Sequence, residues 1–176
     1  MTRPIINIAD VEFREHGHGA PALQPGAPPP REIYQARLGD VAGRIGARKL
    51  GYGIVVVPPG KRAWPAHSHR VNEEAFFVLE GDGEVRIGSE VYPVKKGDFI
   101  ANPPGGPEGA HQIRNTSANN ELKYIAISTR ETPEVVHYPD SGKIGVAQLV
   151  TGPDGKPQRW WHLASDQMTL TYWDGE

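Results

Sequence analysis

The chain has 176 residues, of which 38% are hydrophobic and 23% charged, a composition typical of one soluble globular domain. Lysine and arginine number 19 against 21 aspartate and glutamate residues, and no basic stripe stands out, so we expect no binding to nucleic acid. The absence of cysteine excludes disulfides, thiolate metal sites and cysteine nucleophiles.

No segment has the apolar character of a signal peptide or of a membrane span. The first ten residues lack an apolar core, and the longest aliphatic run, residues 54–57, is too short to cross a bilayer. We therefore expect a cytoplasmic protein that does not bind membranes.

The first 32 residues are irregular in character. Residues 21–30 include five prolines, which excludes an inner strand or a helix there. We interpret this segment as a coil that lies over the body of the fold or reaches a partner subunit. His16 and His18 flank a glycine in this segment, and we interpret them as part of a solvated loop rather than a metal site.

From residue 50 to residue 128, short apolar runs alternate with turn-forming residues. Val85 and Ile87 alternate with charged residues, as in a strand with one buried face. The sequence Glu-Gly-Asp-Gly at residues 80–83 indicates a hairpin turn. Strands that recur every 8–12 residues or so predict an all-β sandwich or barrel. The expected strands are residues 53–57, 75–79, 85–87, 91–94, 99–101, 111–114 and 122–128.

After residue 129 the β pattern weakens. Residues 135–138 and 146–150 are further candidate strands, and the tail is rich in aromatic residues, namely Trp160, Trp161, Tyr172 and Trp173. Clustered aromatic residues usually pack on the body of a fold or on a second copy of it. We therefore divide the chain into an N-terminal arm (1–32), a barrel (33–150) and a C-terminal extension (151–176) packed on the barrel or on a partner, and we expect a homodimer.

Four side chains are candidate ligands of one metal ion. His67 and His69 are two residues apart, which on a strand places both on one face, about 6.6 Å apart along it. Glu74 has the wrong parity for that face, so the chain between must turn and let it enter from the next strand. His111 lies in another expected strand. A small barrel can bring ligands from several strands together in its interior.

These residues resemble the two motifs of the cupin superfamily. The first motif is a glycine, His-x-His, a glutamate and a second glycine, and here it spans residues 60–81 with Gly60, His67, His69, Glu74 and Gly81. Glu74 is preferred to its neighbour Glu73 because six residues separate it from Gly81, as the motif requires. One residue more than usual lies between Gly60 and His67, which we interpret as a loop insertion.

The second motif spans residues 97–115, with Gly97, Pro103, Gly105, His111 and Asn115. Its loop between Gly105 and His111 is three residues longer than the motif, and this insertion touches no ligand. The short interval of 15 residues between the motifs resembles that of small microbial cupins with a single conserved barrel. The resemblance covers about residues 50–130.

The resemblance implies a jelly-roll barrel, also called a double-stranded β-helix, that holds one divalent metal ion on the four candidate ligands. Three imidazoles and a carboxylate suit Fe, Mn, Ni or Zn, so this donor set does not identify the metal. The candidate pocket residues are of two kinds. Two precede His67 and are expected at the barrel mouth, and two share the parity of Glu74; they are Arg62, Trp64, Phe76 and Val78.

Three functional hypotheses follow, because an ion with four protein ligands keeps positions open for a small molecule. The first is an Fe(II)-dependent dioxygenase acting on a small chelating molecule. The second is a non-redox isomerase, epimerase or lyase for a sugar or hydroxy acid, with the metal as a Lewis acid. The third is a small-molecule-binding module without turnover. Cupins do all three, so the fold does not decide.

The tract that starts at Tyr138 and ends at Lys143 resembles a segment of small cupins without assigned function. Its Pro-Asp-Ser-Gly sequence is typical of a turn, which is the interpretation we prefer. The alternative places His137 or Lys143 near a substrate.

Overall fold

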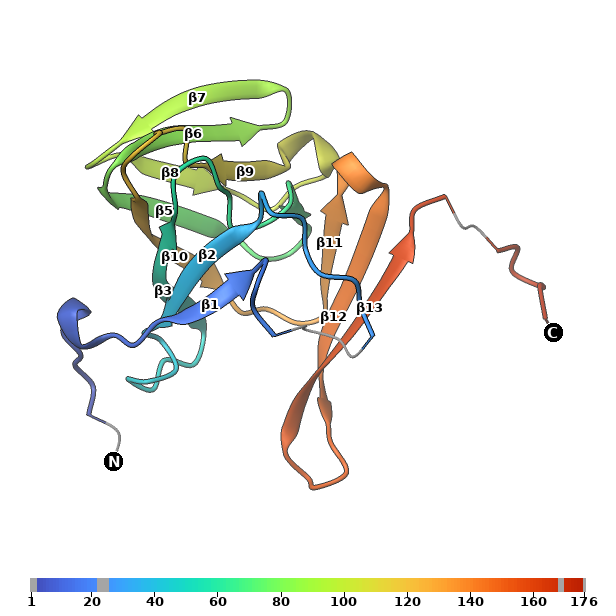
Figure 1. The fold of residues 1–176 in the computed structure, drawn as a ribbon. Helices are drawn as coiled ribbons and strands as arrows, with labels where there is room; N and C mark the ends of the chain where they lie inside the picture. Colours follow the sequence, from blue (N-terminus) through green and yellow to red (C-terminus); the bar gives the residue numbers. More distant parts are fainter. Residues whose placement is uncertain (1–2, 22–25, 168–169, 176) are drawn as a thin grey trace.

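The computed structural model describes residues 3–21, 26–167 and 170–175, and its strands form two facing layers (Figure 1). Within these ranges the only helical segments are three short 3-10 turns, Ile8–Asp10, Pro107–Gly109 and Pro139–Ser141. The all-β fold predicted from the sequence is confirmed. In the part of the chain that the structure describes, no helix has the length and apolar character needed to span a membrane.

One layer is a sheet of six strands. Their order across the sheet is β1 (Arg14–Gly17), β2 (Gln35–Asp40), β3 (Leu50–Val57), β10 (Leu122–Thr129), β5 (Glu74–Glu80) and β8 (Phe99–Asn102). Each neighbouring pair is antiparallel, and β3, β10 and β5 form the centre.

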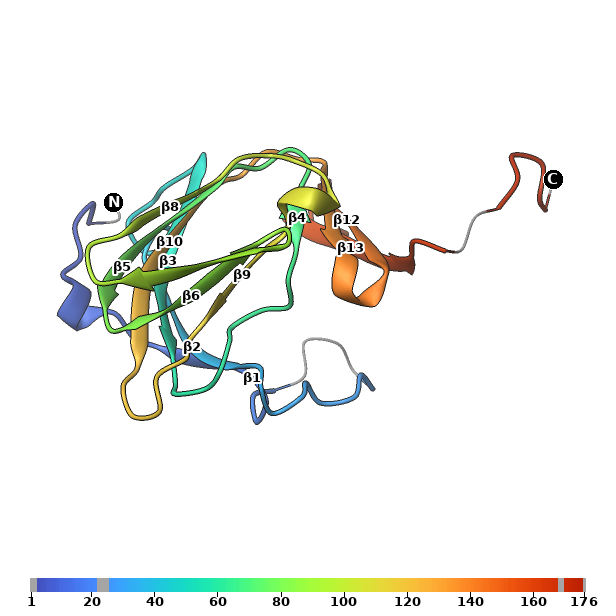
Figure 2. The same ribbon diagram turned by 90° about the horizontal axis from the view of Figure 1, so that it is seen from above.

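The facing layer consists of two smaller sheets that meet at the candidate metal site. The first contains β7 (Glu90–Lys95), β6 (Asp82–Ile87) and β9 (His111–Arg114). The second contains β13 (Pro157–Ser165), β12 (Lys143–Thr151), β11 (Glu134–Tyr138) and β4 (Ser68–His69). A backbone bridge between His67 and His111 joins the two sheets into one layer. Figure 2 shows this layer edge-on beside the six-stranded sheet.

The space between the layers holds the hydrophobic core. Alternate residues of the central strands point into it, since side chains of a strand alternate between its faces. Val55 and Val57 of β3, Val78 of β5 and Tyr124 of β10 are all nearly fully buried and belong to one cluster. On the outer side of β3, Ile54 and Val56 pack in a second, smaller cluster with Val11.

The chain changes layers at Gly81, which corrects the hairpin expected at residues 80–83. β5 pairs with β8 and β10, whereas β6 pairs with β7 and β9, so β5 and β6 are not hairpin partners. Gly81 has a φ of +79°, and a Cβ there would lie 2.3 Å from the carbonyl oxygen of Glu121. Glycine is therefore required at this corner for two independent reasons.

At the N-terminal end, β1 is an edge strand in the segment expected to be irregular, and it pairs with β2. Residues 22–25 of the proline-rich stretch lie outside the described residues. The solvated-loop interpretation of His16 is wrong: it lies on β1, half-buried, with its ring centroid 5.4 Å from that of Trp64. Burial lowers its pKa.

At the C-terminal end, β12 and β13 form a hairpin in which every residue of one strand has a partner in the other. Figures 1 and 2 show its outer part standing clear of the six-stranded sheet. The tail beyond β13 exposes the side chains of Tyr172 and Trp173, so these two residues do not pack on the barrel of their own chain. Packing on a partner stays a prediction.

Candidate metal centre

The two layers bring the four predicted ligands together. His67 and His69 flank Ser68 at the start of β4 and share one face. His111 opens β9 directly opposite His67, where two backbone hydrogen bonds of 3.1 and 2.8 Å join the residues. Glu74 is the first residue of β5 in the opposite sheet, so its carboxylate crosses the interior to meet the three rings.

The imidazole Nε2 atoms converge on one oxygen of Glu74. Their distances to Glu74 Oε2 are 3.0 Å for His111, 3.6 Å for His69 and 3.9 Å for His67. The ligand atoms of His67, Glu74 and His111 all lie within 4.8 Å of one another, which is a group that can hold a metal ion. His69 is not a member of that tighter group, although its Nε2 faces the same carboxylate oxygen.

The opposite nitrogen of two rings is held by a hydrogen-bond acceptor. Nδ1 of His67 donates to the carbonyl oxygen of Pro65 at 2.9 Å, and Nδ1 of His69 donates to Oε2 of Glu134 at 3.3 Å. An imidazole whose Nδ1 carries the proton presents the lone pair of Nε2. Both rings are thereby fixed in the tautomer and orientation that suit a metal ligand.

His111 is held in the same way by the amide of Asn102, which contacts its Nδ1. With the amide nitrogen toward the ring, Asn102 donates, and its own Oδ1 is buried without a hydrogen-bond partner. With the amide turned over, Oδ1 accepts the Nδ1 proton, and the amide nitrogen takes the buried position of the oxygen. The second orientation leaves the His111 Nε2 lone pair facing Glu74.

Glu134 is a buried anion that the sequence analysis did not identify. Its side chain is 6% exposed. Besides His69, its carboxylate accepts backbone N–H groups of Arg70, Val71, Asn72 and Val135, and the side-chain amide of Asn72. Burial would raise the pKa of Glu134, but the hydrogen bonds from Asn72 and the nearby His69 outweigh it and hold the pKa below its ordinary value. Glu134 is therefore an ionised acceptor that ties β11 to the loop after β4.

The donor atoms themselves lack the hydrogen bonds that burial normally demands. Glu74 Oε2 and His111 Nε2 are both buried without a hydrogen-bond partner of good geometry. Burial and the neighbouring His111 lower the pKa of His67 to about 4, so it is a neutral donor at neutral pH. Burial would raise the pKa of Glu74, but the nearby histidines, His111 above all, hold it below its usual range. Three imidazoles around a carboxylate fit a divalent cation.

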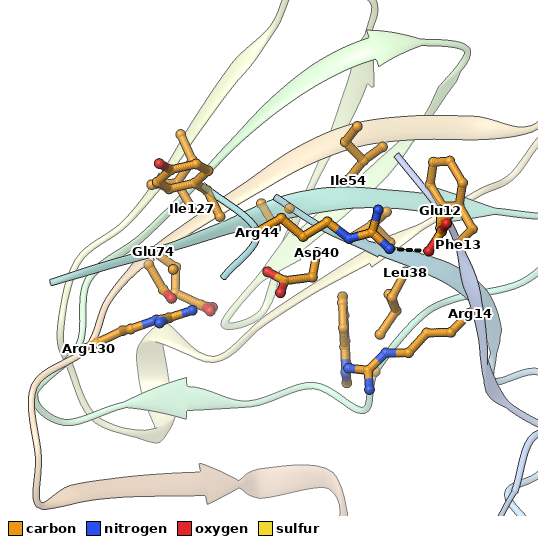
Figure 3. Close-up of a pocket in the computed structure, with 17 residues that line it drawn as sticks. Glu12, Phe13, Arg14, Leu38, Asp40, Arg44, Ile54, Glu74, Ile127 and Arg130 are labelled. Atoms are coloured by element: carbon orange, nitrogen blue, oxygen red, sulfur yellow. Dashed lines mark hydrogen bonds and ion pairs between the residues drawn. The ribbon is translucent and has the colours of Figure 1, made fainter. Parts of the chain in front are cut away.

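A cavity of about 780 Å³ opens beside this cluster, and its lining includes Glu74 (Figure 3). Ser128 of β10 lies opposite Gly51 of β3 on one side and opposite Glu74 of β5 on the other. Residues paired in this way share one face of a sheet. Gly51, Ser128 and Glu74 thus form a row across one face of the sheet. Because Gly51 has no side chain, this row leaves space in front of Glu74.

The other predicted pocket residues lie in different places. Trp64 lines the cavity with Glu74. Phe76 and Val78 point inward, as their parity predicts, but they lie deeper in the core cluster, where the Phe76 ring centroid is 5.4 Å from that of His111. Arg62 donates to Gln112 on β9 and does not line the cavity.

The tract that begins at Tyr138 is the end of β11 followed by a 3-10 turn, in agreement with the turn interpretation. Tyr138 stacks over His67 with ring centroids 6.0 Å apart, so it covers the outer side of that ligand. Nε2 of His137 contacts Nε of Arg70 at 3.0 Å. Lys143 lies over the Tyr138 ring at 5.7 Å.

Comparison with known proteins supports the motif assignment. Residues 53–128 match the family model described as a cupin domain. An uncharacterised protein of Methanocaldococcus jannaschii is 38% identical over 80 residues. That match covers 46% of this chain and 60% of the relative, so the chain spans less than two thirds of the length of the curated protein it matches.

Two solved structures share the fold over nearly the whole chain, and a third shares it over 72%. A candidate sugar phosphate isomerase from Acidithiobacillus ferrooxidans has a TM-score of 0.72 at 24% identity, covering 96% of both chains. A sugar phosphate isomerase of the cupin superfamily from Silicibacter pomeroyi has a TM-score of 0.72 at 21% identity, covering 96% of this chain and 98% of that one. A predicted oxalate decarboxylase from Thermotoga maritima has a TM-score of 0.55 at 17% identity, covering 72% and 99%. The chain therefore carries a cupin domain over residues 53–128, and its fold is that of these solved structures.

Proposed function

We propose that this protein is a metal-dependent enzyme acting on a small polar molecule that chelates the ion. The observation that carries the proposal is the convergence of three imidazole Nε2 atoms on one buried carboxylate oxygen, at 3.0 to 3.9 Å. Two of these four donor atoms have no hydrogen-bond partner. His67, His69, Glu74 and His111 would hold the ion, and Glu134, Asn102 and the Pro65 carbonyl would keep the rings aimed at it.

The cavity supports a role in binding a small molecule. Its lining includes Glu74 and mixes charged side chains with Trp64 and Leu38. A divalent ion bound there would polarise a carbonyl or hydroxyl of the substrate as a Lewis acid. The chain's own residues would orient that substrate, and Trp64 would cover its apolar side.

Non-redox chemistry on a sugar or hydroxy acid is the reaction class we favour. The support is the likeness over 96% of the chain to two proteins named as sugar phosphate isomerases, together with the charged side chains among the residues that line the cavity. An isomerase moves a proton between neighbouring carbons and needs no external oxidant.

An Fe(II)-dependent dioxygenase is the second candidate. The supporting observation is the donor set: three imidazoles and one carboxylate leave open positions on a six-coordinate ion, enough for O₂ and a substrate side by side. The two candidates differ in one measurable respect, because only the dioxygenase consumes O₂.

The decisive experiment begins with metal analysis of protein purified without added metal. Reconstituted samples with Fe, Mn, Ni or Zn are then incubated with aldose and hydroxy-acid panels, in D₂O under argon and separately in air. Deuterium incorporation under argon supports the isomerase, and O₂ uptake in air supports the dioxygenase. If no sample binds one ion per chain, the enzyme proposal fails and a binding module without turnover takes its place.

A further inference from the structure

The cavity contains cationic side chains that the metal site does not use. Among the charged residues of its lining, Arg44 is paired with Glu12, and Asp40 accepts the backbone N–H of Gly43. Arg14 and Arg130 also line the cavity, and no carboxylate of the described residues lies within ion-pair distance of either guanidinium. Their donors are free to meet a ligand.

Arg130 is folded over the row of residues that leads to Glu74. It follows β10 directly, two positions after Ser128. A Cβ at Gly51 would lie 3.0 Å from Nε of Arg130 and 3.0 Å from Oγ of Ser128. The guanidine group therefore uses the space that the missing side chain of Gly51 provides, and in Figure 3 it points toward the part of the cavity that Glu74 occupies.

Arg14 lies at the other side of the same cavity. It is on the edge strand β1, opposite Leu38 of β2, and Leu38 is itself a lining residue. Figure 3 shows Arg14 beside Leu38, away from Arg130 and Glu74. A molecule that reaches along the cavity from Glu74 would pass one free guanidinium near the ion and meet a second one farther out.

We propose that Arg130 and Arg14 bind oxyanion groups of the substrate, so that the enzyme takes an anionic hydroxy compound and discriminates against a neutral one of the same size. Guanidinium groups form charge-assisted, often bidentate hydrogen bonds with carboxylate and phosphate oxygens. This inference rests on the proposed function, since the ion would hold the other end of the same molecule.

Three probes of equal chain length test the proposal by calorimetry on metal-loaded protein: erythritol, which is neutral, erythronate, which adds a carboxylate, and 4-phosphoerythronate, which adds a phosphate. We expect affinity to rise in that order. Loss of a hydrogen bond to a charged group costs about 1.5–3 kcal/mol, so Arg130→Ala and Arg14→Ala should each weaken binding of the doubly anionic probe by roughly 10- to 100-fold. Erythritol binding should not change.

The matched control is Arg48→Ala, which removes an exposed arginine that is not among the lining residues. Arg130→Lys, which keeps the charge, should retain part of the affinity. The inference is overturned if wild-type protein binds erythritol as tightly as the anions, or if both alanine variants bind 4-phosphoerythronate like the wild type.

The metal content of each sample tests the proposed function separately from the role of the arginines. Line broadening of inorganic phosphate in ³¹P NMR, measured on metal-free protein, reports phosphate binding to the arginines in the absence of the ion. Broadening that Arg130→Ala removes and Arg48→Ala keeps supports the inference even if the protein holds no metal. Equal broadening in all three proteins contradicts it.

Discussion

Glu134 accepts a hydrogen bond from Nδ1 of His69 at 3.3 Å, although the two residues lie 65 positions apart in the chain. The contact exists because β11 pairs with β4, with Val136 opposite His69. One buried carboxylate thus orients His69, a predicted metal ligand, and also accepts hydrogen bonds from backbone N–H groups of the loop that follows His69.

Glu134→Gln should weaken metal binding by roughly 10- to 100-fold, which is the usual effect of losing a partner that orients a metal-bound histidine. The neutral amide still fills the space, but it is a weaker acceptor for His69 Nδ1. Competition with a chromophoric chelator measures the affinity, and circular dichroism checks the fold.

Glu131→Gln is the control, because Glu131 is exposed and contacts Asn72 through its backbone carbonyl and N–H, which the substitution keeps. If Glu134 served only to hold the loop, the variant would unfold at a lower temperature yet bind metal normally well below that temperature. Wild-type affinity in Glu134→Gln would refute the positioning role.

The pH dependence of stability should report the burial of His16. Burial lowers the pKa of this ring, with the nearby Arg14 acting in the same direction and a hydrogen bond to the Ala63 backbone opposing them. Histidine in the unfolded chain has a pKa of about 6.5. Below that pH, His16 binds a proton in the unfolded chain but not in the folded chain. The free energy of unfolding should therefore fall as the pH drops below 6.5, by at most about 1.4 kcal/mol per pH unit for this one group.

His16→Gln should flatten that slope between pH 6.5 and pH 5 in urea unfolding of the metal-free protein. Above pH 7.5 both proteins should show the same dependence, which serves as the internal control. An identical slope in the acid range would mean that His16 titrates alike in the folded and unfolded chains.

Local patterns in the sequence predicted β3 and β5 to β12 and, together with the family motifs, the candidate ligands, but they did not predict β1, β2, β4 or β13. His67 and His69 share a face because a strand alternates, and that follows from a spacing of two. The parity of Phe76 and Val78 likewise predicts that they point inward, which they do. Parity does not give depth along the barrel, so it could not show that Phe76 lies under His111 while Trp64 reaches the cavity.

Features that depend on the pairing of distant strands could not be predicted. Glu134 follows a proline and has no local pattern that marks it as an acceptor for His69. The turn at residues 80–83 has the composition of a hairpin, and only the partners of β5 and β6 show that it is a corner between sheets. Arg130 joins the cavity because β10 lies between β3 and β5.

Alanine at Gly81 should cost more stability than alanine at Gly97. Both glycines have positive φ, +79° and +95°, and so each variant carries about 1–2 kcal/mol of backbone strain. Gly97 has no atom within 4 Å of the added Cβ, whereas at Gly81 the carbonyl oxygen of Glu121 would lie at 2.3 Å. Urea unfolding measures both. Equal losses would show that the corner relaxes without cost.

The homodimer expected from the sequence has a candidate contact surface on the β12–β13 hairpin. Leu149, Trp161 and Leu163 share one face of it, and Leu149 and Leu163 are 59% and 41% exposed. Exposed leucines on this face gain stability when a partner covers them. Light scattering at micromolar concentration should give twice the 19.2 kDa of one chain. Leu163→Asp should halve that mass without changing the metal content, and a wild-type monomer would contradict the prediction.

Removal of single ligands should abolish tight metal binding while the barrel persists. His69 lies at the rim of the site, where its side chain is 19% exposed, so His69→Ala and His69→Gln should fold normally and lose most of the metal. His111 is 2% exposed and packs against Phe76, so His111→Ala also leaves a cavity in the core, at a cost of about 1–3 kcal/mol. His162→Ala, on the exposed hairpin, is the control and should keep one ion per chain.

Plasma mass spectrometry gives the metal per chain after reconstitution with Fe, Mn, Ni and Zn, and thermal unfolding shows which variants remain folded. The bound ion should raise the unfolding temperature of the wild type and of His162→Ala, because a ligand that binds only the folded state stabilises it by mass action. It should leave the unfolding temperature of the His69 and His111 variants unchanged. If both sets of variants keep one tightly bound ion per chain, the four-ligand assignment is wrong.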